Sequence, residues 1–145
     1  MRRAWSQLQT MVSACTQCST ALPSIPVQCP PGVLYPAGIV PPSSVKILFV
    51  AVAPPKTGVH FYTDPHDKLS RGLFEVLTCL QRPCQTINDF LSHDYFLVHT
   101  AKCAIRGTTS PDIAVSSLCA KTHLKAEIED LLPDAVCWLS KNISY

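Results

Sequence analysis

The stretch VKILFVAVAPPKTGVHFYTD at residues 45–64 decides the fold of this chain. Its first six residues are mostly apolar and rich in β-branched and aromatic side chains. This pattern predicts a strand buried on both faces of a parallel sheet, although a short buried helix gives a similar run. Pro54 and Pro55 end that element, because proline donates no amide and restricts the residue before it. Open α/β sheets bind ligands at the carboxyl ends of their strands, so the loop that follows is the candidate site.

Two further apolar runs predict strands of the same sheet, at residues 95–98 and 135–139. Apolar residues at helical spacing predict a helix over residues 69–80 and a long amphipathic helix over residues 113–132. Strands that alternate with helices form parallel sheets through right-handed crossovers. We therefore expect an α/β three-layer sandwich whose central parallel strand lies at residues 45–50. Its last layer is expected to be incomplete at the C-terminus.

The whole chain, residues 1–145, is expected to form a single domain. Residues 1–44 would carry a short amphipathic helix with a cysteine pair, followed by an irregular proline-rich connector. Residues 45–145 would form the α/β core. No internal repeat is present in the sequence.

Composition limits the possible classes of function. Hydrophobic residues make up 47% and charged residues 15% of the chain, which fits a globular protein with a large interior. The formal net charge is only +2, so contacts with nucleic acid would have to come from a local basic patch. No run reaches the roughly 18 apolar residues of a membrane span, and polar residues interrupt the N-terminus. We therefore expect a cytoplasmic protein with no membrane partner.

The chain has eight cysteines, which in a reducing compartment favour metal or cluster binding over disulfides. Cys15 and Cys18 have the C-x₂-C spacing that lets two thiolates face one metal. Cys103 follows a predicted strand, and Cys119 lies on the next predicted helix. These four predict one site for an iron–sulfur cluster or a structural zinc; the alternative is four small buried side chains. The other cysteines are interpreted as buried (Cys79, Cys137) or left unassigned (Cys29, Cys84).

Taken together, these segments resemble the uracil-DNA glycosylase superfamily, especially its iron–sulfur branch. There, a C-x₂-C pair precedes a strand that ends in a Gly-Glu-x-Pro-Gly type loop. A later strand ends in Thr-Asn-x-x-Lys-Cys, and a fourth cysteine follows on the next helix. The matching pieces here are Cys15 and Cys18, LFVAVAPPKTG, HTAKC and Cys119, and DLLPDAVCWLSKN matches the family's Leu-x-Pro-x-x-(Val/Ile)-x-x-Leu-Gly segment. Order and spacing agree over roughly residues 15–142.

The resemblance implies the fold and chemistry of a base-excision DNA repair hydrolase. Such enzymes extrude a base from uracil-containing or single-stranded DNA and hydrolyse its glycosidic bond. The resemblance also implies a 4Fe–4S cluster, with zinc as the alternative, on the four cysteines. Ala53 and Pro54 would bind the base, and Phe61, or its neighbour Tyr62, would stack on it. His99 stands where the family has the asparagine that reads the uracil edge.

Three departures from the family predict reduced or absent activity. Val52 stands where the family has an acidic or polar catalytic residue, and valine cannot orient water. His99 cannot reproduce the paired donor and acceptor of an amide. The chain ends before the segment expected to carry the histidine that stabilises the leaving base. We expect His123 on the exposed side of its helix, and His60 and His66 are weak substitutes in the loop.

The sequence therefore predicts a DNA-binding, uracil-DNA glycosylase-like protein with reduced or no activity. The alternative is an iron–sulfur or zinc-bearing interaction or DNA-binding module on the same fold, without catalysis. A nucleotide-binding α/β protein is disfavoured, because residues 53–56 lack the glycines that let a backbone cradle phosphate. The expected contacts to DNA phosphates are Lys56, Lys102 and Arg106.

Overall fold

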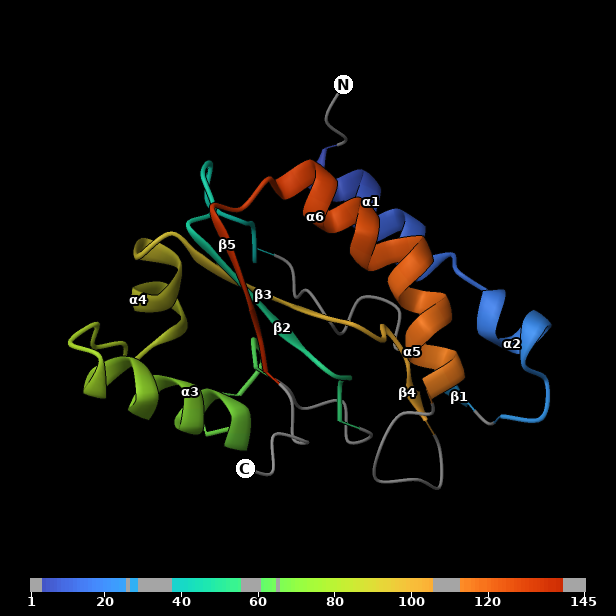
Figure 1. The fold of residues 1–145 in the computed structure, drawn as a ribbon, viewed down its shortest axis with the longest axis horizontal. Helices are drawn as coiled ribbons and strands as arrows, with labels where there is room; N and C mark the ends of the chain where they lie inside the picture. Colours follow the sequence, from blue (N-terminus) through green and yellow to red (C-terminus); the bar gives the residue numbers. More distant parts are fainter. Residues whose placement is uncertain are drawn as a thin grey trace.

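The computed structural model of the chain describes residues 4–25, 27–28, 38–55, 61–64, 66–105 and 113–139, and the statements below concern these residues. Three parallel strands lie in the middle of the molecule, with helices on both sides (Figure 1). The elements are, in chain order, α1 (Trp5–Ser13), α2 (Gln17–Ala21), β1 (Val27–Gln28), β2 (Ile47–Ala51), α3 (Lys68–Cys79), α4 (Ile87–Ser92), β3 (Tyr95–His99), β4 (Ala104–Ile105), α5 (Ile113–Cys119), the π-helical turn η1 (Ala120–Leu124), α6 (Lys125–Leu131) and β5 (Ala135–Trp138).

The strand β2 is the centre of the sheet, whose order is β3-β2-β5. Both neighbours run parallel to it, with Ile47 opposite Tyr95 on one side and Ala135 on the other. This confirms the predicted α/β class and the central position of the first apolar run. A separate antiparallel pair of two-residue strands, β1 and β4, was not expected from the sequence.

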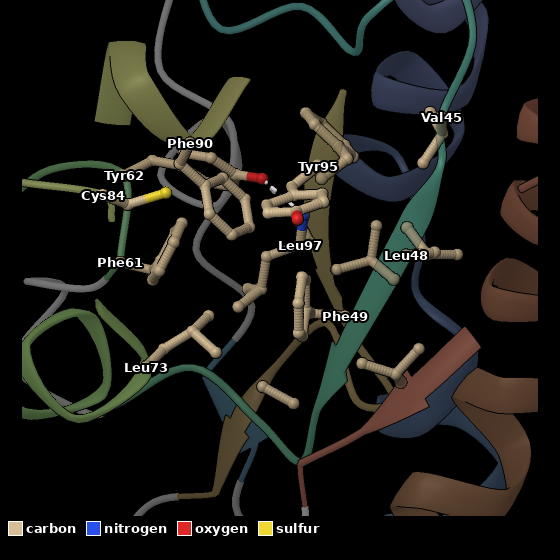
Figure 2. Close-up of a cluster of buried hydrophobic side chains, with 14 of the residues drawn as sticks. Val45, Leu48, Phe49, Phe61, Tyr62, Leu73, Cys84, Phe90, Tyr95 and Leu97 are labelled. Atoms are coloured by element: carbon tan, nitrogen blue, oxygen red, sulfur yellow. Dashed lines mark hydrogen bonds between the residues drawn. The ribbon is translucent and has the colours of Figure 1, made fainter. Parts of the chain in front are cut away.

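The helices cover both faces of this sheet. In Figure 1, α3 and α4 lie on one side, and α1, α5 and α6 lie on the other. On the α3–α4 side, the buried ring of Phe90 lies at the centre of an aromatic core (Figure 2). Its centroid lies 5.0 Å from that of Phe61, 5.6 Å from Phe49, 5.7 Å from Tyr95 and 6.1 Å from Phe74. The core therefore connects β2, β3, α3 and α4.

The helix α3 begins where Asp67 caps it, since the carboxylate accepts hydrogen bonds from the amides of Leu69 and Ser70. Its buried side carries Leu73, Phe74 and Leu77, as the helical spacing predicts. Cys79 is exposed, which corrects the expectation that it is buried, because it lies on the other side of the last turn.

Cys137 is only half-buried, which also corrects the sequence-based expectation. It lies on β5, which is the last strand of the sheet among the described residues. At the two ends of β5, Ala135 and Trp138 are exposed, although the whole run is apolar. No helix in the described part of the chain has the length and apolarity needed to cross a membrane.

The outer edge of β3 is closed by a side chain. The Tyr62 hydroxyl donates to the carbonyl of Leu97 at 2.9 Å and accepts from the amide of Leu97 at 2.7 Å (Figure 2). Both backbone groups are thus satisfied without another strand. Burial, with a further contribution from the charge of Glu127, holds the pKa of Tyr62 well above its usual range. Tyr62 therefore serves here as a neutral structural partner of the strand.

The long helix predicted over residues 113–132 is present as three consecutive pieces, α5, η1 and α6. The π-helical turn η1 widens the winding in the middle of this helix. Leu132 has a φ of 45° and ends the helix in a left-handed conformation. It is exposed, which corrects its expected inward position.

Candidate functional site

The carboxyl ends of β2 and β3 meet at one edge of the sheet. Ala51, the last residue of β2, lies opposite His99, the last residue of β3. The pairing continues past both strands, because the amide of Thr100 donates to Ala51 at 2.8 Å and that of Ala101 donates to Val52 at 2.9 Å. The loop after β2 and the turn after β3 are therefore held side by side at the edge where parallel sheets bind ligands.

The predicted base-binding residues lie in two different surroundings. Ala53 is half-buried and packs against a small apolar cluster that contains Cys18 and Cys119, while Pro54 is buried. His99 is 1% exposed. Phe61 is fully buried in the aromatic core, with its ring 4.9 Å from that of Tyr62. Their convergence on one concave pocket stays a prediction.

Four further residues are candidates for the site: His60, His66, Lys56 and Arg106. His66 is exposed in the segment before α3. His60, Lys56 and Arg106 lie outside the residues that the structure describes.

Two of the four predicted ligand cysteines, Cys18 and Cys119, are in contact, and Cys15 is near enough to act on Cys18 electrostatically. We call Cys15, Cys18 and Cys119 the thiol cluster. The thiol of Cys18 is hydrogen-bonded to that of Cys119, and both are 3% exposed. Burial, followed by the neighbouring thiols of Cys119 and Cys15, raises the pKa of Cys18 to about 12. The thiol cluster is formed because α2 packs against α5, next to Ala101 of the turn after β3.

The fourth predicted ligand, Cys103, is buried and disulfide-bonded. A disulfide sulfur is not a thiolate ligand, so Cys103 would have to be reduced before it could join the thiol cluster on a metal. Among the described residues, no three His, Cys, Asp or Glu side chains are placed to hold a metal ion together. The soft sulfur donors of the thiol cluster nevertheless suit zinc or an iron–sulfur cluster.

Lys102 is buried, which corrects its expected role as a contact to DNA phosphates. Its ammonium group donates to the carbonyl oxygen of His99 and pairs with the carboxylate of Glu127 at 2.5 Å. The side chains of Lys102 and Glu127 are each 1% exposed. We call this pair of contacts the Lys102 bridge. This bridge could not be predicted from the sequence, because a lysine and a glutamate 25 residues apart carry no spacing signal.

His123 is also buried, at 4% exposed, which corrects its expected position on the exposed side of the helix. Burial, followed by the positive charge of Lys102, lowers the pKa of His123 below its ordinary value of 6.5. Its Nε2 atom has no hydrogen-bond partner within the part of the chain that the structure describes. A buried, neutral imidazole beside an ammonium group therefore lies behind the turn after β3.

The free energy of unfolding is expected to depend on the state of His123. The unfolded chain binds a proton near pH 6.5, whereas the folded chain binds it only at lower pH, so stability is fully present above 6.5 and falls as the pH decreases. Replacing His123 by leucine should flatten the stability profile between about pH 7.5 and pH 5, measured by urea unfolding. The control is His66→Asn at an exposed position, which should leave the slope unchanged. Equal slopes in both variants would contradict this assignment.

No family model and no curated protein matches this chain.

Proposed function

We propose that this chain is a uracil-DNA glycosylase-like domain of the base-excision repair type. It binds uracil-containing or single-stranded DNA, and its hydrolytic activity is reduced or absent. The observation that supports this proposal is the paired edge of the sheet, where the loop after β2 and the turn after β3 run side by side. The resemblance assigns its base-binding residues to these two segments.

The same edge lacks two groups that hydrolysis of a glycosidic bond requires. Val52 is half-buried, and its carbonyl accepts a hydrogen bond from the amide of Ala101. Its apolar side chain cannot orient an attacking water. His99 stands where the family has an asparagine, whose side-chain amide offers one donor and one acceptor to the edge of uracil. Loss of a single positioned donor of this kind typically lowers kcat by about 10²–10³. Binding of DNA does not depend on those groups, because most contacts to DNA reach phosphate and sugar.

A single-stranded oligonucleotide with one uracil tests the proposal. With excess protein, followed by alkali to cleave abasic sites, we expect turnover near background. We also expect binding that weakens as salt increases. The matched control is the same oligonucleotide with thymine in place of uracil, and we expect His99→Ala to reduce any preference between the two. Robust cleavage would contradict the loss of activity, and a lack of binding at low salt would contradict the DNA-binding assignment.

A second candidate function is a metal-bearing interaction module on the same fold, without catalysis. The thiol cluster favours it, because the thiols of Cys18 and Cys119 are in contact, with Cys15 near them, while the edge of the sheet carries an apolar Val52. We propose that the reduced protein holds a 4Fe–4S cluster, or zinc, with Cys103 as the fourth ligand. When bound, such a group would cross-link α2, α5 and the turn after β3, and so stabilise the fold.

Metal loading is expected to require the thiol cluster. After reduction and incubation with iron and sulfide, the protein should turn brown and absorb visible light, and Cys15→Ser should abolish this absorbance. Cys79→Ser is the control, because Cys79 is exposed at the end of α3, and it should load like the wild type. A chelator should lower the Tm of loaded protein only. Reduced wild-type protein that retains neither iron nor zinc would rule out the metal proposal.

A further inference from the structure

We propose that Lys102 is a positioning residue, which fixes the turn after β3 through the Lys102 bridge and thereby sets the geometry of the proposed DNA-binding edge. The turn comprises residues 100–103, between the end of β3 at His99 and the start of β4 at Ala104. The inference rests on the proposed function in one respect: that this edge is where DNA binds. The contacts that fix the turn are independent of that assignment.

The Lys102 bridge joins two parts of the molecule that the sheet itself does not connect. On one side, the ammonium group donates to the carbonyl of His99, at the last residue of β3. On the other side, it pairs with Glu127 on α6. Lys102 therefore holds the turn against α6, in addition to the backbone hydrogen bonds of the turn itself.

Stability alone does not account for a buried ion pair at this place. Removing a lysine and a glutamate from water costs several kcal/mol per ion, and apolar residues of similar size often serve the fold equally well or better. What apolar side chains cannot supply is a charged, directional hydrogen bond to a carbonyl oxygen. The distinctive contribution of Lys102 is therefore the orientation of the peptide group of His99.

That orientation determines the positions of several groups. The next two amides, of Thr100 and Ala101, donate to the carbonyls of Ala51 and Val52 and so set the register between the two loops. Ala101 is fully buried and packs against the apolar cluster that contains Cys18. A change at the peptide of His99 would therefore displace both the loop after β2 and the packing against the thiol cluster.

The amide of Leu97 can serve as an internal reference that separates loosening of the turn from general destabilisation. Two residues before His99, the amide of Leu97 is held by the Tyr62 hydroxyl at 2.7 Å. This contact belongs to the same strand. Glu127 contributes less than burial does to the raised pKa of Tyr62, so the hydroxyl should stay neutral and bonded to Leu97 when Glu127 is replaced. Loosening of the turn alone should therefore leave the amide of Leu97 unaffected, whereas general destabilisation should affect all three amides.

The test is amide hydrogen exchange, measured by NMR, on the double variant Lys102→Met/Glu127→Leu. This variant leaves no unpaired buried charge and should retain the Tm of the wild type. We expect exchange at Thr100 and Ala101 to be about tenfold faster or more, and exchange at Leu97 to be unchanged. Unchanged protection at Thr100 and Ala101, or equally reduced protection at all three amides, would overturn the positioning role.

The reversed pair Lys102→Glu/Glu127→Lys separates the ion pair from the hydrogen bond. It keeps opposite charges, but a carboxylate at position 102 has no hydrogen to donate to the carbonyl of His99. We expect the same loosening of the turn, and wild-type protection in this variant would overturn the proposal. If neither double variant folds, amide exchange in the wild-type protein is the remaining test. Rapid exchange at Thr100 and Ala101 there would overturn the proposal, because it would show that the turn is not fixed.

Binding of the uracil-containing oligonucleotide then connects the turn to function. Weaker binding by the double variant than by the wild type supports the positioning role at the DNA-binding edge. Equal binding by both proteins overturns that role. If the wild type itself does not bind, the proposed function fails, while the exchange data still decide whether the Lys102 bridge fixes the turn.

Discussion

Replacing Lys102 by methionine, with Glu127 left in place, is expected to lower the free energy of unfolding by about 3–5 kcal/mol. The reason is that Glu127 is 1% exposed and would lose the charge that neutralises it. A domain of this size has a free energy of unfolding of roughly 5–15 kcal/mol, so a large part of its stability would be lost. Urea unfolding followed by circular dichroism measures the effect.

Lys46→Met is the matched control for this experiment. Lys46 pairs with Asp94 at 2.8 Å, but its side chain is 61% exposed. Exposed ion pairs contribute little to stability, so this variant should unfold close to the wild-type midpoint. Adding Glu127→Leu to Lys102→Met should recover most of the loss, because the buried carboxylate that lost its ammonium partner is then removed. Equal effects of Lys102→Met and Lys46→Met would show that the buried pair is not neutralising a buried charge.

Tyr62→Phe is the second substitution with a large expected effect. It removes only the hydroxyl, yet it leaves both the amide and the carbonyl of Leu97 without their partner in the protein interior. A buried polar group without a partner costs about 1–3 kcal/mol, so we expect the free energy of unfolding to fall by about 2–4 kcal/mol. The variant should also aggregate more readily, because β3 then presents an unpaired edge.

Tyr95→Phe is the corresponding control. Tyr95 is buried, and its ring packs against Phe49 and Phe90. Its hydroxyl makes no hydrogen bond within the segments that the structure describes, so its removal should change stability little. If both tyrosine variants unfold at the wild-type midpoint, the hydroxyl of Tyr62 does not protect the edge of β3.

The strands and long helices could be predicted because each carries a strong pattern. The run at residues 45–50 is apolar and β-branched, as expected for the middle strand of a parallel sheet. Elements that involve few residues were not predictable. The strands β1 and β4 are two residues long, and α4 has only six residues with one buried side chain, Phe90. Such short elements depend on tertiary contacts more than on local sequence pattern.

The positions of His123 and Glu127 were missed for a geometric reason. Residues spaced by four drift around a regular α-helix by about 40° per step, so Val115 and Glu127 would differ by about 120°. In the structure, four of the six buried positions do follow a spacing of four: Val115, Cys119, His123 and Glu127. The wider π-helical turn η1 accounts for this, since each of its turns takes up more residues. No residue pattern in the sequence predicts such a π-helical turn.

The candidate site is less predictable than the fold, because it depends on which side chains fill the space behind the sheet edge. Spacing alone suggested that cysteines from distant segments share a site, and the thiols of Cys18 and Cys119 are in contact. Spacing could not reveal that Lys102 points inward, because a lysine after a strand is usually exposed. Its burial is made tolerable by Glu127 on the facing helix and by the carbonyl of His99.

The π-helical turn also makes the residue count of this helix a constraint on evolution. Deleting one residue within Ala120–Leu124 would allow regular winding and still leave Glu127 within about 20° of the side it now occupies, because eleven regular steps make almost three full turns. Deleting a residue while the π-helical turn remains, or inserting one, would instead rotate Glu127 away from Lys102 by about 100°, although every side chain in the bridge would be chemically unchanged. Divergent copies of this domain that keep a lysine before Cys103 should therefore keep the interval between Cys119 and Glu127, or shorten it by one residue where the helix winds regularly.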